Sequence, residues 1–229
     1  MLFIILGFFM LLSWLIGNQL KKKFSEFSQI PTSSGLSGKE VAEKMLRENN
    51  IYDVKVISVD GQLTDHYNPL DKTINLSRDV FSGRNVSAAA VASHECGHAV
   101  QHEQAYAFLK FRTAMVPVVN IASKMMNFIF IASIFFSFIL HIFSSENVLL
   151  TIIVSQGIIT LFSLVTLPVE FDASRRALVW LESSRITRGA EHEKAKVALQ
   201  WAASTYLVSA LASLSTLLYY IWMLTGRRD

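Results

Sequence analysis

The sequence predicts a mainly α-helical integral membrane protein with about four transmembrane helices and a small α+β unit outside the bilayer. Apolar residues make up 52% of the 229 residues, and the mean hydropathy is +0.37. The apolar residues gather in four blocks without Asp, Glu, Lys or Arg, each near the roughly 20 residues that cross a hydrocarbon core. The chain between the blocks contains helix caps, turn residues and alternating patterns, which are typical of a folded α+β unit.

The four blocks predict an anchor helix, a helical hairpin and a final transmembrane helix. They cover residues 2–17, 125–143, 148–167 and 203–224. The first block lacks a preceding charge and a small-residue cleavage site, so we expect an uncleaved anchor rather than a signal peptide. Only four residues separate the second block from the third, which predicts a tight antiparallel hairpin.

Charge sets the expected orientation. Alternating crossings place residues 18–124 and 168–202 on one side, and these segments hold nearly all the Lys and Arg residues, including the run Lys21-Lys22-Lys23. Because basic residues accumulate on the cytoplasmic side, we expect a multi-pass cell-membrane protein whose N-terminus lies outside. The C-terminal pair Arg227-Arg228 is the one departure from this rule.

The first cytoplasmic segment shows local signals for an α+β unit. A capping-box pattern at Ser37-Gly38-Lys39-Glu40 predicts an amphipathic helix over 38–49, with an inner face of Val41, Ala42, Met45 and Leu46. Alternation over 53–59 and a second short run over 73–77 predict strands that are separated by turns. Ser87 is a candidate N-cap for a long helix that starts at Ala88 and runs to about 108.

Composition also excludes some functions. The formal charge of +3 is that of a membrane protein with basic residues beside the bilayer, and basic residues are not interleaved with exposed aromatics as in a nucleic-acid interface. We therefore expect no nucleic-acid partner. Cys96 is the single cysteine, so no disulfide can form within the chain.

The predicted helix from Ala88 carries the pattern His94-Glu95-Cys96-Gly97-His98. Residues four apart share one helix face, so both imidazoles can reach one ion. The intervening glutamate can then act as a base toward the attacking water, as in HExxH zinc peptidases. Small residues surround the pattern and allow other backbones to pack closely against it. The alternative is that the two histidines are ordinary residues of a helix.

A catalytic zinc ion needs a third protein ligand, and Glu170 is the best candidate. Pro168 suits the opening of a new helix, and the hairpin returns this segment to the side that holds the two histidines. Asp172 is the rival, two residues further on. His102 lies about 12 Å along the helix from His94, too far to share an ion with both histidines. In the alternative interpretation, both acids are juxtamembrane charges that pair with the nearby arginines.

The remaining candidates are weaker. Cys96 lies about 200° around the helix from His94 and is expected to be a small packed residue. His66 and His192 are isolated, and either could donate to a reaction oxyanion, although surface histidines are the simpler interpretation. His141 is expected at the outer membrane interface.

Several longer stretches resemble the YugP-like membrane-bound neutral zinc metallopeptidases of bacteria. They are Leu63-Thr64-Asp65-His66-Tyr67-Asn68-Pro69, Asn75-Leu76-Ser77, Val91 to His102, Val116 to Asn120, and Leu167 to Ala177. More distantly, the order of elements resembles the HtpX and CAAX-prenyl proteases. The resemblance implies a gluzincin site in a zincin-like unit, with His94, His98 and Glu170 on one zinc ion and Glu95 catalytic. In that wider group an aspartate four residues after the glutamate steadies the first histidine. Here that position is Ser174, which leaves Asp172 or Ser174 for the role.

These observations divide the chain into five parts. The parts are a transmembrane anchor (1–20), a cytoplasmic zincin-like unit with the HExxH helix (21–124), a transmembrane hairpin (125–167), a cytoplasmic helical segment with the third zinc ligand (168–202), and a C-terminal transmembrane helix and tail (203–229).

The predicted function is an integral-membrane zinc endopeptidase that binds a peptide or protein substrate, membrane proteins included, beside the lipid bilayer. A substrate strand could add to an exposed edge at Thr73–Ser77. One alternative is a membrane scaffold with a structural or vestigial zinc site, but such a site needs no base like Glu95. Another is a transporter, which would need charged residues or broken helices in the middle of the membrane. The four apolar blocks contain mainly Asn127, Gln156 and Gly157 as candidates for such features.

Overall fold

The computed structural model describes residues 1–135 and 145–226, and contacts divide the chain into two units. The first, here called the helical unit, consists of Met1–Trp14, Phe111–Leu167 and Tyr206–Asp229. The second, here called the mixed unit, consists of Leu15–Lys110 and Pro168–Thr205. The predicted positions of His141, Arg227 and Arg228 lie outside the described residues.

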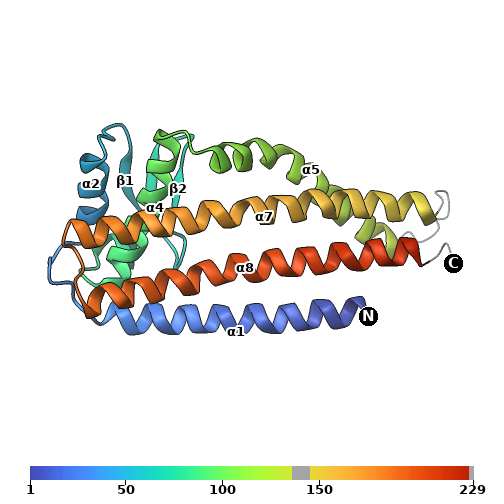
Figure 1. Cartoon of the computed structure of the whole chain (residues 1–229), viewed down its shortest axis with the longest axis horizontal. Coiled ribbons are helices and arrows are strands. Elements are labelled where there is room, and N and C mark those ends of the chain that lie inside the picture. Colours follow the sequence, from blue (N-terminus) through green and yellow to red (C-terminus); the bar gives the residue numbers. More distant parts are fainter. Residues whose placement is uncertain (136–144, 227–229) are drawn as a thin grey trace. The chain divides into compact units, whose positions relative to one another are not determined.

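Four helices are long and apolar enough to cross a membrane, which agrees with the predicted number (Figure 1). They are α1 (Leu2–Ser28), α5 (Ala107–Phe135), α7 (Ser145–Ser183) and α8 (Ala190–Thr225). The chain is therefore mostly helical and has the composition of a multi-pass membrane protein.

Two helix boundaries differ from the sequence-based expectation. The second span was expected over 125–143, but its helix already begins at Ala107, and residues 136–144 lie outside the described part. Pro168 was expected to open a new helix, and this prediction is wrong because Pro168 lies inside the continuous helix α7. A proline removes one backbone hydrogen bond, and the many bonds on either side of it keep the chain helical.

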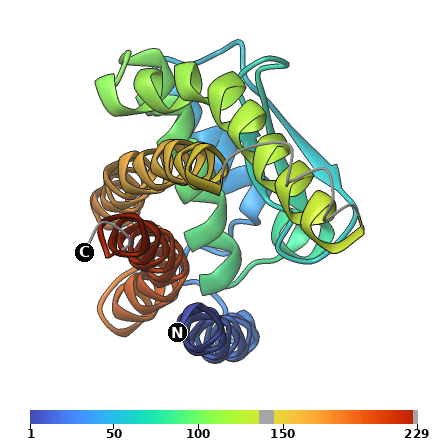
Figure 2. The same ribbon diagram turned by 90° about the vertical axis from the view of Figure 1, so that its right-hand side faces the viewer.

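In the helical unit, polar side chains join α7 to α8, which run side by side in Figure 2. The amide of Gln156 donates to the carbonyl of Ser213 at 3.1 Å and to its hydroxyl at 3.0 Å, and Thr160 contacts the same residue. Hydrogen bonds between helices are favourable where lipid offers no alternative partner. Gln156, considered above for a transporter, therefore has a structural role in helix packing.

The mixed unit contains a three-stranded sheet with the order β1-β3-β2. The strands are β1 (Lys55–Val59), β2 (His66–Asn68) and β3 (Thr73–Ser77). β1 pairs with β3 in parallel and β2 pairs with β3 antiparallel, so β3 is the central and most buried strand. The expectation that Thr73–Ser77 forms a free edge is therefore wrong. β2 is an edge strand, and its three residues were too few to give a sequence signal.

Two short helices pack beside this sheet. α2 (Gly38–Glu48) begins with the predicted capping box between Ser37 and Glu40, and its predicted inner face is buried. α3 (Arg78–Ser82) follows β3 directly. A Cβ atom on Gly38 would lie 2.2 Å from the carbonyl oxygen of Val80, so only glycine permits this contact between the two helices.

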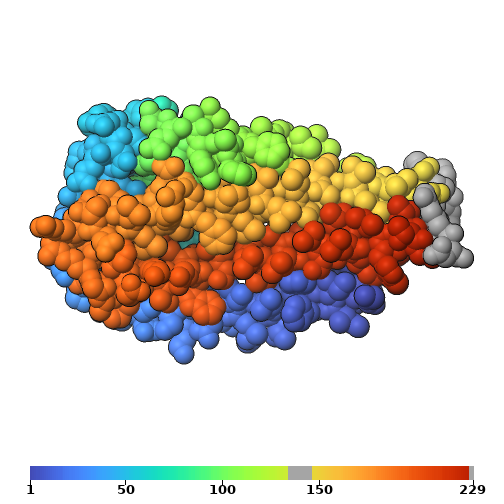
Figure 3. Space-filling model, in the orientation of Figure 1, coloured from blue at the N-terminus to red at the C-terminus, as the bar shows by residue number. Residues whose placement is uncertain are grey.

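Helix α4 (Val86–Glu103) runs through the middle of the mixed unit. Its N-cap is Asn85, whose side chain accepts from Ala88 N–H, and not Ser87 as expected. The hydroxyl of Ser87 instead donates to the carbonyl of Phe24 in α1. The expected end near 108 is also too late, because α5 starts as a separate helix at Ala107. Figure 3 shows residues of α7 and α8 (orange) on one face of this unit.

Within the mixed unit, Glu48 ties α2 to α7. Its Oε2 accepts from Trp180 Nε1 at 2.7 Å and from Ser184 Oγ at 2.8 Å. Lys44 forms an ion pair with the same carboxylate at 2.9 Å. The hydrogen bond from Lys44 and these two donors hold the pKa of Glu48 below its usual value of 4.5.

We predict that this contact makes stability fall in acid. Because the pKa is lowered on folding, the stabilisation is present above pH 4.5 and is lost as the pH falls through the lowered value. The difference in melting temperature between wild type and Glu48→Gln in detergent should therefore shrink from pH 7 to pH 3. A difference that is constant over this range would contradict the prediction.

Candidate metal centre

Helix α4 presents His94 and His98 side by side. They are four residues apart, and their ring centroids are separated by 4.8 Å with the planes at 85°. Their side chains are 13% and 11% exposed. The two Nε2 atoms face the same space, which is the arrangement that the sequence pattern predicted for a shared ion.

Glu170 reaches this space from α7. Its Oε2 lies 3.4 Å from His94 Nε2 and 3.5 Å from His98 Nε2, and the residue is only 2% exposed. The three side chains offer ligand atoms that all lie within 4.8 Å of one another, the one such group among the described residues. The structure thus brings together the three residues that were predicted as metal ligands.

The spacing suits a tetrahedral zinc ion. Ligand atoms about 2.0–2.2 Å from a tetrahedral centre lie roughly 3.3–3.6 Å from one another. The two distances from the Glu170 oxygen fall in this range. Two imidazoles and one carboxylate are also the donor set of several catalytic zinc sites, which keep a fourth position open. The residues present therefore fit the metal that the pattern implies.

Gly97 makes the meeting of α4 and α7 possible. A Cβ atom at this position would lie 2.6 Å from the carbonyl oxygen of Ala173 and 3.1 Å from its Cα. The backbones touch at this point because neither side chain separates them, and Glu170 lies one turn before Ala173 on α7. A larger residue at position 97 would push the third ligand away from the histidines.

Each histidine is held at its other ring nitrogen. His94 Nδ1 lies 3.1 Å from Ser174 Oγ, and His98 Nδ1 lies 3.1 Å from Gln101 Oε1. Partners of this kind orient metal-binding imidazoles in many proteins. Of the two residues considered for steadying the first histidine, Ser174 contacts His94, whereas the hydrogen bonds of Asp172 go to Gln101, Arg175 and Arg176.

Charge also favours a cation between these side chains. Burial lowers the pKa of His98, whereas the hydrogen bond and the charge of Glu170 raise it, and the net pKa lies above its usual value of 6.5. The buried carboxylate stabilises positive charge on the imidazole, and it would stabilise a metal cation in the same place.

Glu95 is held by the edge of the sheet. Its Oε2 accepts the backbone N–H of Tyr67 in β2 at 3.0 Å, and the residue is 8% exposed. Since this N–H donates to Glu95 in α4, it lies on the outer side of the edge strand β2. The Tyr67 hydroxyl in turn lies 2.8 Å from His102 Nδ1, so Tyr67 joins β2 to α4 at two points.

Asp65 fixes the start of this strand. Its carboxylate accepts the Ser77 N–H at 2.7 Å and the Ser77 hydroxyl at 3.1 Å. Burial raises the pKa of Asp65, and the two hydrogen bonds from Ser77 oppose this effect. β3 and β2 are therefore joined just beyond their paired residues, at a point two residues before Tyr67.

The other predicted candidates lie elsewhere. His102 is held by Tyr67, and Asp172 binds Gln101, Arg175 and Arg176, so neither belongs to the three-residue group. Cys96 is fully buried against the carbonyl of Ala42, and burial raises its thiol pKa well above the usual value, as expected for a packed residue. His66 contacts Thr64, and His192 contacts Thr187.

Two contributors to the site were not predicted. Gln101 lies three residues after His98, and this spacing on the same helix face could have identified it. The Tyr67 N–H is a backbone group, and a sequence pattern gives no signal for such a donor unless the pairing of the strand is known.

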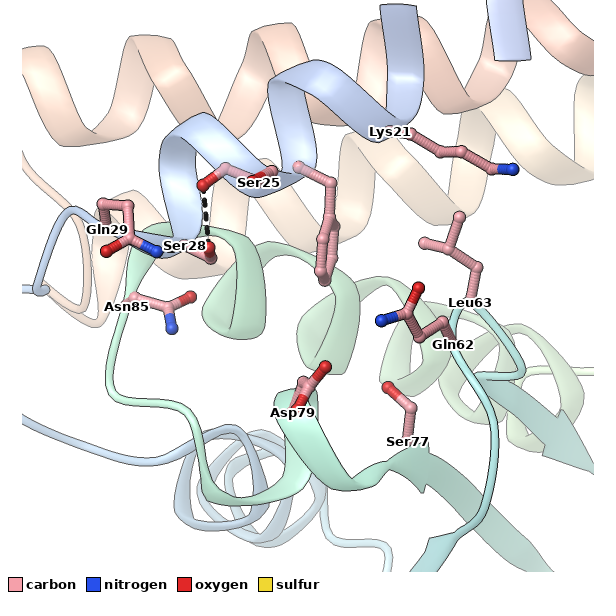
Figure 4. A pocket seen from close by; sticks show the side chains of 10 residues that line it. Lys21, Ser25, Ser28, Gln29, Gln62, Leu63, Ser77, Asp79 and Asn85 are labelled. Carbon is pink, nitrogen blue, oxygen red and sulfur yellow. Dashed lines mark hydrogen bonds between the residues drawn. The ribbon is translucent and has the colours of Figure 1, made fainter. Parts of the chain in front are cut away.

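A separate cavity of about 580 Å³ lies between the end of α1, the loop with Gln62 and Leu63, and residues 77–85 (Figure 4). Its lining includes Lys21, Gln62, Ser77 and Asp79. None of the three residues of the candidate metal centre lines it. Ser77 contributes its hydroxyl both to this lining and to the bond with Asp65.

The buried group of two histidines and a glutamate, in a chain with four candidate membrane helices, has the features of a membrane metallopeptidase. The sequence matches the family described as "Putative neutral zinc metallopeptidase" over residues 2–225. The chain belongs to this family, which confirms the resemblance noted in the sequence and implies zinc as the metal.

A curated relative supports this assignment. The chain is 39% identical over 211 residues to the "Putative membrane protease YugP" of Bacillus subtilis (strain 168), and the alignment covers 92% of this chain and 91% of the relative. No solved structure matches the chain.

We predict that Gly97→Ala disrupts the metal centre. The added methyl group would meet the Ala173 carbonyl, and overpacking of this kind costs about 1–3 kcal/mol. Zinc content and melting temperature should both fall. Gly157→Ala is the matched control, because a Cβ atom there meets nothing within 4 Å and alanine favours the helix. Equal zinc content in the two variants would show that the close crossing is not required.

Proposed function

We propose that the chain is an integral-membrane zinc endopeptidase in which His94, His98 and Glu170 bind one zinc ion and Glu95 is the general base. The observation that carries this proposal is the convergence of three ligand atoms within 4.8 Å, with the Glu170 oxygen 3.4 and 3.5 Å from the two imidazole nitrogens, beside a glutamate whose carboxylate is separately held. A zinc ion held by these three residues would supply Lewis acidity for the attacking water and for the peptide carbonyl.

Glu95 has the surroundings of a proton-transfer group. The Tyr67 N–H holds one of its oxygens, so the carboxylate has a fixed orientation beside His94. In this position it would take a proton from the attacking water and then give it to the leaving amine. A purely structural zinc site needs no such group, and this favours the enzyme over the scaffold.

The outer edge of β2 is the proposed place for an extended substrate. The Tyr67 N–H on this edge is taken by Glu95, and the Tyr67 carbonyl group points to the same side. A peptide that donates to this carbonyl would run past Glu95. β2 thus replaces Thr73–Ser77 as the candidate docking strand. We retain the proposal that the site faces the cytoplasm, since it rests on the distribution of basic residues.

Metal analysis of purified protein tests the proposed function. Wild type should contain one zinc ion and cleave an unfolded substrate such as casein. Glu95→Gln should keep the zinc and lose at least about 100-fold in kcat, because the base is removed without loss of a ligand. Glu170→Ala should lose the zinc.

The same variants also identify the alternatives. If Glu170→Ala keeps its zinc, the third ligand lies elsewhere. If Glu95→Gln cleaves as fast as wild type, Glu95 is not the base. Zinc that is bound without any cleavage in wild type would favour the structural site.

We further predict that Asp65→Ala slows cleavage without removing zinc. Loss of the bonds to Ser77 would loosen β2 and with it the Tyr67 N–H that holds Glu95. Misplacement of a reacting group by about 1 Å can cost about 100-fold, so kcat should fall while zinc content stays constant. Asp79→Asn is the control on the neighbouring cavity wall. An unchanged kcat in Asp65→Ala would show that the strand does not depend on this contact.

A further inference from the structure

The two histidines of the metal centre differ in how their protonation is fixed. A histidine that binds a metal through Nε2 must carry its proton on Nδ1. His94 Nδ1 faces the hydroxyl of Ser174, which can donate or accept and is therefore compatible with either tautomer. His98 Nδ1 faces the side-chain oxygen of Gln101, which can only accept. The partner of His98 thus demands a proton on Nδ1.

The orientation of the Gln101 amide follows from its other contacts. The residue is fully buried, and its Nε2 lies 2.8 Å from the carbonyl oxygen of Val169 and 2.9 Å from Asp172 Oδ2. Both partners are acceptors. Turning the amide over would place its oxygen against two oxygens and would leave its donors facing His98. The amide therefore presents its oxygen to His98.

Asp172 is kept as an acceptor by two arginines. Its Oδ1 accepts from Arg175 Nη2 and its Oδ2 from Arg176 Nε, both at 2.5 Å, and the residue is 9% exposed. Arg176 is itself held by Gln104 at 2.6 Å. Such charge-assisted pairs favour the ionised carboxylate, which cannot donate to Gln101.

We propose that Asp172 and Gln101 form a tautomer lock, in which Asp172 orients the Gln101 amide and Gln101 keeps the proton of His98 on Nδ1. The Nε2 lone pair of His98 is then available to the metal. Both are positioning residues that act through His98 and do not touch the metal. The inference rests on the proposed function, because it takes His98 as a zinc ligand.

Gln101 also helps to fix the spacing between α4 and α7. Gln101 lies one turn after His98 on α4, while Val169 and Asp172 lie on either side of Glu170 on α7. The side chain of Gln101 therefore contacts His98 directly and donates a hydrogen bond to the backbone carbonyl of Val169, next to Glu170. Asp172, the rival for the third ligand position, takes part in the site through this second role.

The test compares zinc affinity in Gln101→Met, which keeps the volume and loses every polar contact. Competition with a chelator on full-length protein in detergent should show binding weakened about 10- to 100-fold. Gln156→Met is the matched control, because it removes another buried amide that joins two helices. Its zinc affinity should equal that of wild type.

Nitrogen NMR of labelled histidine reports the tautomer of His98, which would not change if Gln101 had only a structural role. In metal-free Glu170→Ala at alkaline pH, where His98 is neutral and no carboxylate competes for a proton on Nε2, the ring proton should reside on Nδ1. Adding Gln101→Met to this variant should mix the two tautomers. His98→Asn identifies the signals that belong to this ring. A ring in Glu170→Ala with its proton on Nε2 would overturn the lock.

A rescue experiment tests the link to Asp172. Gln101→Glu places a carboxylate beside Asp172, and the repulsion should weaken zinc binding. Adding Asp172→Asn supplies an amide donor to the new carboxylate and should recover most of the affinity. The proposal is overturned if Gln101→Met binds zinc within about threefold of wild type, or if the double variant is no better than Gln101→Glu. If wild type has no zinc affinity, the proposed function fails first.

Discussion

The metal centre depends on the close crossing of α4 and α7 at Gly97 and Ala173. Two backbones can approach this closely only where a Cβ atom is missing, and the crossing then sets the distance from Glu170 to both histidines. Gln101 reinforces the crossing by joining the Val169 carbonyl to the face of α4 that holds His98. The HExxH pattern thus contains more than two ligands and a base, since its fourth residue determines whether a third ligand can reach them.

The site is held from both sides by elements of different kinds. On one side, α7 contributes Glu170 and Ser174, which contact the histidines, and Asp172, which contacts Gln101. On the other side, the edge of the sheet holds Glu95 through a backbone group. Backbone donors and buried amides lose little freedom when a substrate binds, so an arrangement of this kind is ordered in advance. The segment around Asp65 and Tyr67 therefore has a physical role in placing the Glu95 carboxylate.

Much of this organisation could be predicted from local sequence patterns. The capping box of α2, the strand Thr73–Ser77 and the histidine pair are local features, and each follows from spacing and side-chain type. Glu170 was located because the topology returns its segment to the side of α4. Features that depend on long-range contacts were missed. Asn85 was passed over for Ser87 because only the structure shows that the Ser87 hydroxyl binds Phe24. Pro168 was taken as a helix start because the continuous packing of α7 overrides its local preference.

The central position of β3 in the sheet also could not be predicted from local sequence patterns. A strand of five residues gives a period-two pattern, but the pattern does not reveal which strands lie beside it. The partner β2 is too short to be noticed, and its importance lies in one N–H group. Local reasoning therefore named the candidate ligands and the candidate base, while the groups that contact them came from the tertiary structure.

The burial of Cys96 has a practical consequence for determining which way the chain crosses the bilayer. The single thiol is fully enclosed between α4 and α2, and its raised pKa keeps it protonated and unreactive. The native protein therefore behaves toward maleimide reagents as if it had no cysteine. Single cysteines placed in the polar segments can be labelled from one face of intact cells with a reagent that does not cross membranes. The native sequence needs no prior replacement for this mapping, and the residue inside the HExxH helix stays untouched.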